Sequence, residues 1–165
     1  MTHGYLIALG SNRRGRHGDP CAEVRAALAA IGARRISPIV TTAPLGPSNR
    51  AYANAVALVE DAADPPTMLA RLKRIERDFG RRRGRRWGAR VIDLDIIAWS
   101  GGTWESPDLV IPHTAFRERD FVLRPLVALV PGWRDPLTGL SARQLHARLT
   151  RRRALPNRRF AGAGP

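Results

Sequence analysis

Four segments of the chain are continuously or alternately apolar and are separated by polar, glycine-containing turns. Such runs predict strands, here over residues 5–9, 36–42, 52–60 and 91–99. The second run contains Pro38, which has no backbone N–H to donate, so we expect it at a sheet edge. Apolar residues at helical spacing, with the usual start and stop signals, predict two helices: Asp19-Pro20 to Gly32, and Pro65 to Gly80.

The predicted elements follow one another in the order β-α-β-β-α-β. This order is typical of a ferredoxin-like α+β fold, in which a four-stranded sheet carries both helices on one face. Beyond it, residues 109–129 are expected to form irregular and short helical segments, and residues 141–149 a helix. We therefore expect one domain over residues 1–150 with a C-terminal helical extension, and a basic, disordered tail over residues 151–165.

Two carboxylates lie inside the last of these apolar runs. Asp93 and Asp95 are two residues apart, so a strand sends both to one face and sends Ile92, Leu94 and Ile96 to the other. Neighbouring carboxylates repel each other and are costly to bury without a cation between them. Mg²⁺ prefers oxygen ligands and completes its shell with water and phosphate oxygens, so the pair predicts a magnesium site.

The charge of the chain indicates an anionic partner. Of 165 residues, 28 are Lys or Arg and 14 are Asp or Glu, and the formal net charge is +14. Lys73 is the only lysine, and guanidinium groups bind pairs of phosphate oxygens. The same positive charge is compatible with a nucleic-acid-binding module. Against that alternative, only 6% of the residues are aromatic and the RNA-recognition signature is absent. No Gly-x-x-x-x-Gly-Lys-Ser/Thr motif occurs, which excludes a P-loop kinase.

The sequence lacks the features of membrane, exported and disulfide-bonded proteins, and this indicates the cellular compartment. It has no apolar run long enough to span a membrane and no signal-peptide pattern. Its single cysteine, Cys21, cannot form an internal disulfide. We therefore expect a cytoplasmic protein without a membrane partner.

Three further groups have residue types suited to a nucleotide and a flat heterocycle. Tyr52 and Asn54 share a strand face and could stack on and hydrogen-bond a ring. The Arg/Gly-rich segment 81–90 could close over phosphates, and His113 could donate to one. Taken singly, each group also has a structural explanation: a surface tyrosine, a solvated arginine run that reflects genomic base composition, and a structural histidine.

Taken together, these motifs resemble one family. They are Ala8-Leu9-Gly10-Ser11-Asn12, Pro44-Leu45-Gly46-Pro47 with Tyr52 and Asn54, Arg86-Trp87-Gly88 before Asp93-Leu94-Asp95, and Ile111-Pro112-His113 with Arg119 and Phe121. The chain resembles the 6-hydroxymethyl-7,8-dihydropterin pyrophosphokinases of folate biosynthesis from about Tyr5 to Trp133. The resemblance implies a ferredoxin-like fold, two Mg²⁺ ions bound with ATP, and transfer of the β,γ-diphosphate of ATP to the pterin hydroxymethyl group with release of AMP.

The resemblance also implies a role for individual residues. Metal binding falls to Asp93 and Asp95, and catalysis to Arg81, Arg83, Arg90 and Asp95. The pterin pocket comprises Thr42, Leu45, Tyr52, Asn54, Trp87 and Phe121. ATP binding falls to Glu76, Arg83, Arg86, Arg90, Ile96, His113 and Arg119. Either Asp95 or an oxygen bound to the metal takes the hydroxyl proton.

The chain departs from the family pattern at positions that line the nucleotide and pterin sites. These are Val40, Ala43, Asp108 and Thr114, and the arginine segment is one residue shorter than in a well-known member. A relative that binds a pterin without transferring phosphate is the alternative within this family. The retained residues argue against it: Asp93, Asp95, Arg81 and Arg90. We expect a monomer that binds ATP and the pterin and has no specific nucleic-acid partner.

Overall fold

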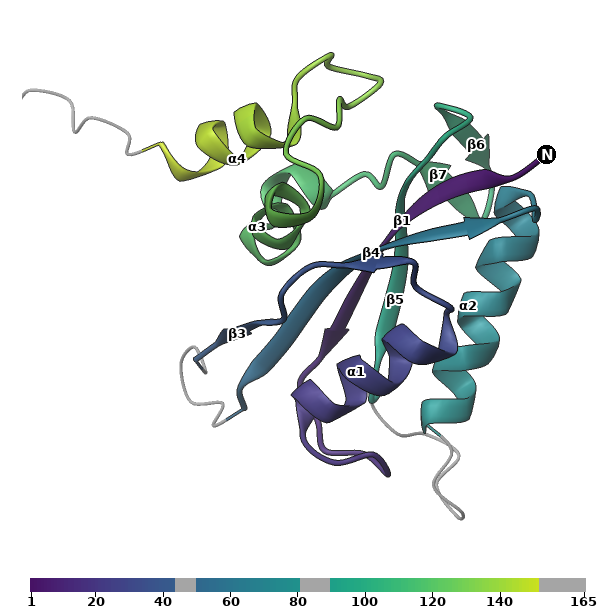
Figure 1. Ribbon diagram of the computed structural model, residues 1–165, viewed down its shortest axis with the longest axis vertical. Coiled ribbons are helices and arrows are strands. Elements are labelled where there is room, and N and C mark those ends of the chain that lie inside the picture. The colour runs from purple at the N-terminus through teal and green to yellow at the C-terminus, as the bar shows by residue number, and fades with distance from the viewer. Residues whose placement is uncertain (44–49, 81–89, 152–165) are drawn as a thin grey trace, which may run out of the picture.

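The computed structural model describes residues 1–43, 50–80 and 90–151, and Figure 1 shows their arrangement. The main antiparallel sheet has the order β2-β4-β1-β5, and β3 also pairs with β4. Its strands are β1 (His3–Ser11), β2 (Arg35–Ile36), β3 (Val40–Thr42), β4 (Tyr52–Asp61) and β5 (Asp93–Trp99). A separate hairpin comprises β6 (Trp104–Ser106) and β7 (Leu109–Ile111).

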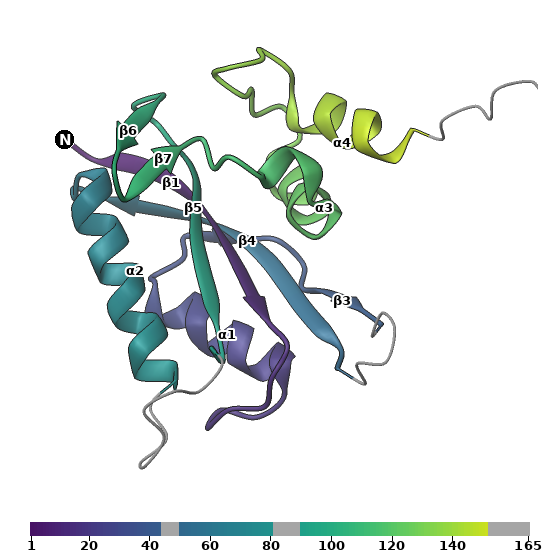
Figure 2. The ribbon, with the colours of Figure 1, turned by 180° about the vertical axis from the view of Figure 1, so that it is seen from behind.

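Helices cover both faces of the main sheet, as the two opposite views show (Figures 1 and 2). One face packs against α1 (Pro20–Ala30) and α2 (Pro65–Gly80). The other face is covered by α3 (Asp120–Leu129), and the 3-10 helix η1 (Phe116–Glu118) and α4 (Ala142–Thr150) pack against α3. Within the described ranges, no helix has both the length and the apolar character that a membrane span needs.

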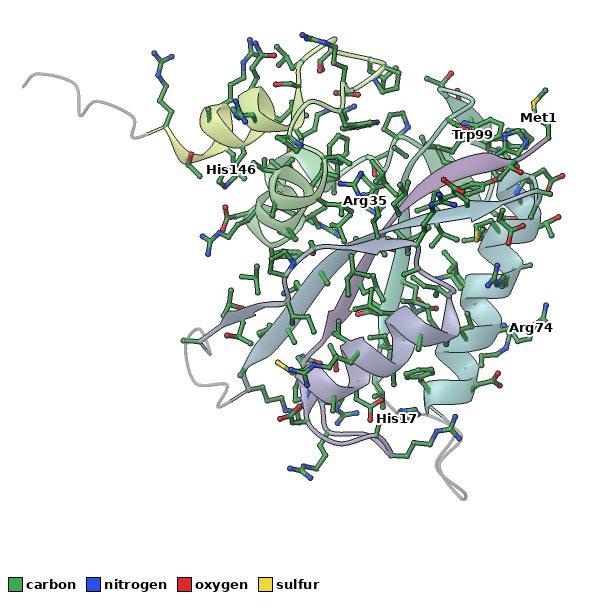
Figure 3. All side chains as sticks on the ribbon, viewed as in Figure 1. Met1, His17, Arg35, Arg74, Trp99 and His146 are labelled. Carbon is green, nitrogen blue, oxygen red and sulfur yellow. The ribbon has the colours of Figure 1, made fainter. Side chains whose placement is uncertain are left out.

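The central strand β1 is apolar throughout because both of its faces are buried. Tyr5, Ile7 and Leu9 pack against α1 and α2, whereas Leu6 packs with the side chains of α3. Alternation along a strand therefore supplies two separate cores from one short segment. On the α3 side, the Arg35 side chain of β2 also donates to the Leu129 carbonyl at 3.0 Å (Figure 3).

The helix ends follow from local capping. The Asp19 carboxylate accepts from the Ala22 N–H at 2.9 Å, and Pro20 occupies the first position of α1. Ser141 and Gln144 form a reciprocal capping box at the start of α4. These helices agree with the sequence prediction, with Ser141 as the cap rather than the first helical residue.

The second predicted strand, residues 36–42, is wrong as a single element. It is divided into β2 and β3, and residues 37–39 lie between them outside any strand. Pro38 cannot donate a ladder hydrogen bond. Beside it, the Ser37 hydroxyl accepts from the Val56 N–H at 2.9 Å, and the Ser37 N–H donates to the Val56 carbonyl at 2.9 Å. The side chain of Ser37 thus replaces the missing backbone pairing, and the sheet has five strands rather than four.

The α+β class and the placement of the first two helices on one face are confirmed. The segment 109–129, predicted as irregular and short helical pieces, contains β7, η1 and the ten-residue helix α3. The β6–β7 hairpin was not predicted. Both features depend on packing against distant parts of the chain: α3 against β4 and Leu6, and β7 beside β5 and α2.

Candidate active site

The first residues of β5 place two carboxylates on the sheet face that α3 covers further along the strand. Leu94 and Ile96 are at most 3% exposed and pack with α1 and α2. Asp93 and Asp95 therefore point to the opposite face. The Asp93 side chain is 61% exposed and Asp95 is half-buried. The predicted orientation of the pair is confirmed.

A row of residues across three strands joins this pair to an amide. Asp93 lies opposite Gly10 of β1, and Gly10 lies opposite Asn54 of β4. A Cβ atom at Gly10 would lie 2.8 Å from the Asn54 Oδ1 atom, too close for both to keep their places. Asn54 is 7% exposed, and its amide has no hydrogen-bonding partner among the described residues. Further along the same face, Thr42 pairs with Tyr52, which is 41% exposed.

His113 lies beside Asp95 and is held as a neutral donor. Its backbone N–H donates to the Ile97 carbonyl at 3.0 Å, and its Nδ1 atom accepts from the Ala115 N–H at 3.1 Å. Burial lowers the pKa of His113, Asp95 opposes this effect and Arg119 adds to it. A neutral ring whose Nδ1 accepts carries its proton on Nε2. That N–H is available to a phosphate oxygen.

Negative charge at the start of β5 is only partly compensated. Burial and the carboxylates of Glu76 and Asp95 raise the pKa of Asp93, while Arg90 and Lys73 lower it. The Arg90 guanidinium is 3.7 Å from Asp93 and 4.0 Å from Glu76. A raised carboxylate pKa means that the charged form is disfavoured where it stands, so a cation would be bound favourably.

The donor atoms fit a magnesium ion that is completed by substrate. Asp93 and Asp95 have carboxylate oxygens on one face of the sheet, and Mg²⁺ prefers hard oxygen ligands of this kind. In the described ranges, no group of three or more His, Cys, Asp or Glu side chains surrounds a single metal position. Two carboxylates would leave most of the shell to water and phosphate oxygens, which is usual for Mg²⁺ in phosphoryl-transfer sites.

Glu76 links α2 to the edge of the sheet. Its carboxylate is 7% exposed, accepts from the Leu94 N–H at 2.8 Å and binds the Lys73 ammonium at 3.0 Å. Because β5 is an edge strand, that N–H has no partner strand to bind. The structure thus gives Glu76 a role in fixing β5 beside α2, in addition to the predicted one at the nucleotide.

The start of α3 supplies a cation and an exposed ring next to His113. The Arg119 guanidinium lies 5.8 Å from the centroid of the Phe121 ring, which is 42% exposed. Between His113 and Arg119, Arg117 makes two hydrogen bonds to the fully buried Asp135, at 2.6 and 2.8 Å. This bidentate pair holds the segment that carries His113 and Arg119 against the loop after α3.

The structure brings together only part of the predicted set. Asp93, Asp95, Asn54 and Tyr52 share one face of the sheet, and His113 and Arg119 border it near Asp95. The Ile96 side chain faces the other way, so any contact that Ile96 makes with a nucleotide would come from its backbone. Five predicted residues lie outside the described part of the chain: Leu45, Arg81, Arg83, Arg86 and Trp87.

A groove of about 430 Å³ lies between α2 and the β6–β7 hairpin. It reaches Lys73, which binds Glu76 and acts electrostatically on Asp93. The groove is lined by Pro66, Leu69, Ala70, Lys73, Ser106, Asp108 and Leu109.

The sequence reasoning assigned no role at the site to Lys73 or to the space at Gly10. For Lys73 the sequence does hold a signal: it precedes Glu76 by three residues on one helix, a spacing that allows an ion pair. The role of Gly10 depends on the register between β1 and β4, for which the sequence holds no local signal.

The profile of one protein family, described as 7,8-dihydro-6-hydroxymethylpterin-pyrophosphokinase (HPPK), matches residues 6–131. Two proteins named 2-amino-4-hydroxy-6-hydroxymethyldihydropteridine pyrophosphokinase are similar to the chain. The one from Haemophilus influenzae is 41% identical over 127 residues, which cover 73% of this chain and 77% of the relative. The one from Synechocystis is 35% identical over 151 residues, which cover 88% of this chain and 75% of the relative.

The fold is also found in solved structures. The chain matches the crystal structure of wild-type Plasmodium falciparum HPPK-DHPS with STZ-DHP, with a TM-score of 0.70 and 14% sequence identity. The match covers 90% of this chain and 43% of the other, so the chain spans less than half of that longer protein. At this identity the likeness concerns the fold alone. The family profile and the two relatives, however, lead to one conclusion: the chain belongs to the 7,8-dihydro-6-hydroxymethylpterin-pyrophosphokinase family.

Proposed function

We propose that the face formed by β1, β4 and the start of β5 is where diphosphate passes from ATP to 6-hydroxymethyl-7,8-dihydropterin, with release of AMP. Membership of the family makes the chain a pterin pyrophosphokinase of folate biosynthesis. The observation that carries the assignment to this face is the row Asp93–Gly10–Asn54, in which a carboxylate and an amide stand on one face on either side of a glycine.

In this proposal the pterin binds on the Asn54 side of the row. The ring edge of a pterin has donors and acceptors that an amide can match, and Asn54 has both to offer. Exposed aromatic rings suited to stacking come from Tyr52 on β4 and Phe121 on α3. The hydroxymethyl group would then point toward Asp95, and Asp95 or another oxygen near it would accept the proton that leaves the hydroxyl.

The phosphates bind on the side of β5. Asp93 and Asp95 would hold Mg²⁺, which when bound would supply positive charge against the phosphates. Arg90 and Arg119 are placed to neutralise charge that develops on the transferring group and on AMP, and His113 donates from Nε2. Because such transfers depend mainly on position and charge, these residues need no strong base among them.

The nucleoside part of ATP is assigned to the groove between α2 and the β6–β7 hairpin. This groove begins next to Lys73, one helical turn before Glu76, and therefore adjoins the phosphate side of the site. Its mixed apolar and polar lining suits a base and a ribose. Asp108, one of the departures from the family pattern, lies in this lining.

The proposal also covers the architecture and setting. We interpret the antiparallel order β2-β4-β1-β5, with α1 and α2 on one face, as a ferredoxin-like arrangement extended by α3 and α4. We assign residues 1–150 to a single pyrophosphokinase domain that works as a cytoplasmic monomer.

Release of AMP from Mg-ATP, measured with and without 6-hydroxymethyl-7,8-dihydropterin, tests the proposal. We expect AMP only when the pterin is present, and no free phosphate. A folded chain that binds ATP but releases no AMP with this pterin would refute the assigned reaction.

A further inference from the structure

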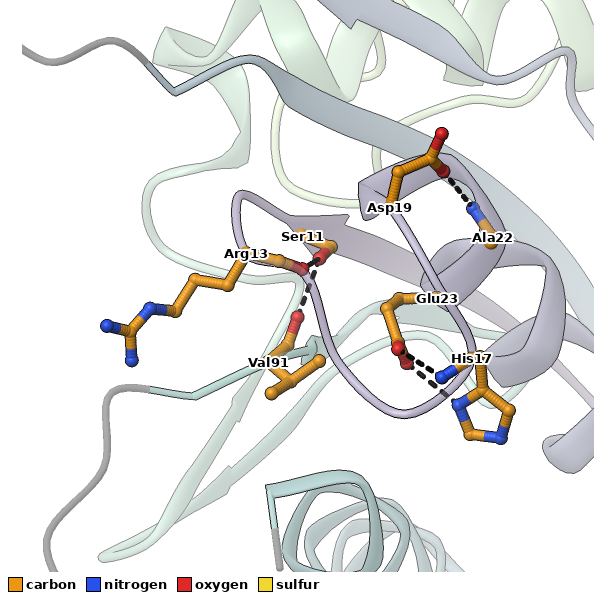
Figure 4. Close-up of polar contacts among 7 residues, drawn as sticks. All are labelled: Ser11, Arg13, His17, Asp19, Ala22, Glu23 and Val91. Carbon is orange, nitrogen blue, oxygen red and sulfur yellow. Dashed lines mark hydrogen bonds and ion pairs between the residues drawn. The ribbon is translucent and has the colours of Figure 1, made fainter. Parts of the chain in front are cut away.

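A buried carboxylate that the proposed reaction does not use lies under the segment between β1 and α1. Glu23 of α1 is fully buried. It accepts from the His17 backbone N–H at 2.7 Å and pairs with the His17 Nδ1 atom at 2.8 Å (Figure 4). A buried charge is costly unless its partner is held in place, so this pair fixes the conformation of the segment.

The same segment contacts two elements of the site. At one end, the His17 ring lies 4.8 Å from the ring of Phe79, in the last turn of α2. At the other, the Ser11 hydroxyl donates to the Val91 carbonyl at 2.7 Å, as Figure 4 shows. The segment thus joins the end of α2 to the residues that lead into β5.

Close packing makes this connection stiff at Gly15. A Cβ atom there would lie 2.6 Å from the Val91 Cγ1 atom and 2.7 Å from the Glu23 Cδ atom. The backbone at Gly15 therefore fills the space between the buried carboxylate and Val91. The Glu23 carboxylate and the Val91 side chain thus both lie close to Gly15, which offers a path by which a shift of Glu23 reaches Val91.

We propose that Glu23 is a positioning residue that, through His17 and the backbone at Gly15, sets where β5 begins. Asp93 follows Val91 by two residues, and Glu76 precedes Phe79 by three residues on α2. The two ends of the segment therefore control the distance between Asp93 and Glu76, which also share the Arg90 guanidinium. The inference rests on the proposed function, since Asp93 is taken to bind Mg²⁺ with ATP.

The test compares Glu23→Gln with the matched control Asp19→Ala in the full chain. The glutamine keeps the shape of Glu23 but loses its charge. The control removes the side-chain cap of α1, which lies in the same segment, without touching Val91. We expect Glu23→Gln to raise the Mg²⁺ concentration for half-maximal AMP release about tenfold, with the KM for the pterin unchanged. Asp19→Ala should leave both values as in the wild type.

A second readout does not depend on catalysis. Amide hydrogen exchange in residues 91–94 should become faster in Glu23→Gln and remain unchanged in Asp19→Ala. His17→Ala, which removes the ring that pairs with the Glu23 carboxylate, should show the same shift in Mg²⁺ dependence and exchange. It decides the question if Glu23→Gln does not fold.

The outcomes separate the two proposals. If the wild type releases no AMP, the proposed function fails, and hydrogen exchange still shows whether Glu23 holds the start of β5. If Glu23→Gln and His17→Ala match Asp19→Ala in both Mg²⁺ dependence and exchange, Glu23 has only a structural role and the inference is overturned. An equal rise in the KM for the pterin would also overturn it.

Discussion

Adding one methyl group at Gly10 should cost the protein its affinity for the pterin. A Cβ atom at this position would lie 2.8 Å from the Asn54 Oδ1 atom, so the amide must turn away in Gly10→Ala. The backbone of β1 need not change, because β strands accept alanine readily. The substitution therefore moves the buried Asn54 amide while it leaves Asp93, on the neighbouring strand, in place.

The size of the effect follows from the hydrogen bonds that Asn54 would make. A buried polar group that loses its partner costs about 1–3 kcal/mol. Since 1.4 kcal/mol is a factor of ten, the dissociation constant for the pterin should rise by a factor between about 5 and about 140. Binding of Mg-ATP depends on the other side of the row and should change by less than about twofold, within the usual scatter of a surface change.

Calorimetric titration with the pterin, and separately with Mg²⁺ and a non-hydrolysable ATP analogue, measures both constants. Gly4→Ala is the matched control: it lies on the same strand, and its Cβ would be in ordinary contact, 3.8 Å from Leu58 Cδ1. In the Asn54→Ala background, Gly10→Ala should add little further loss, because both act on one amide. Wild-type pterin affinity in Gly10→Ala, or an equal loss for the ATP analogue, would refute this reasoning.

Three other substitutions test the charges at the start of β5. Asp95→Ala should lower AMP release by about a hundredfold or more while cooperative urea unfolding persists; near-normal turnover would count against the metal assignment. Because folding raises the pKa of Asp93 from its ordinary 3.8, its charged form costs stability above the raised pKa. Asp93→Asn should therefore be more stable than the wild type in urea at pH 7.5, equally stable below about pH 3.8, and nearly inactive; a less stable variant at pH 7.5 contradicts this. Folding lowers the pKa of His113 from 6.5, so the wild type should lose stability as the pH falls from 6.5 through the lowered pKa. His113→Gln should show a smaller loss between pH 7.5 and 5, and equal losses would contradict the assignment.

The parts of this site that could be predicted are those fixed by local geometry. The period of a strand alone places Asp93 and Asp95 on one face and Leu94 on the other, whatever the neighbouring strands do. The end signals at Asp19-Pro20 act on the N–H groups of the next turn, so α1 also begins where its own residues indicate. Neither prediction required knowledge of a distant residue.

The parts that could not be predicted depend on register and on edges. Asn54 reaches the space at Gly10 only because β1 and β4 pair in one particular register across more than forty residues of chain. The division of the second strand depends on Val56 of β4. Its N–H donates to the Ser37 hydroxyl, and its carbonyl accepts from the Ser37 N–H. Glu76 has its partner in an edge N–H of β5, which exists only once the strand order is known.

Strand β5 contributes to both the core and the candidate site because its register with β1 shifts partway along the strand. Between Leu6 and Ile7 of β1 the register with β5 changes by one residue, so that Ile97 and Ala98 both pack under α3. Upstream, the same face of β5 carries carboxylates, beside strands that offer glycine and asparagine rather than bulky apolar side chains. Apolar residues there would extend the core beneath α3, but they would remove the hard oxygen atoms that a magnesium ion needs. The upward shift of the pKa of Asp93, with burial as its largest cause, indicates that the charged form of this side chain lowers the stability of the fold at this end of the strand.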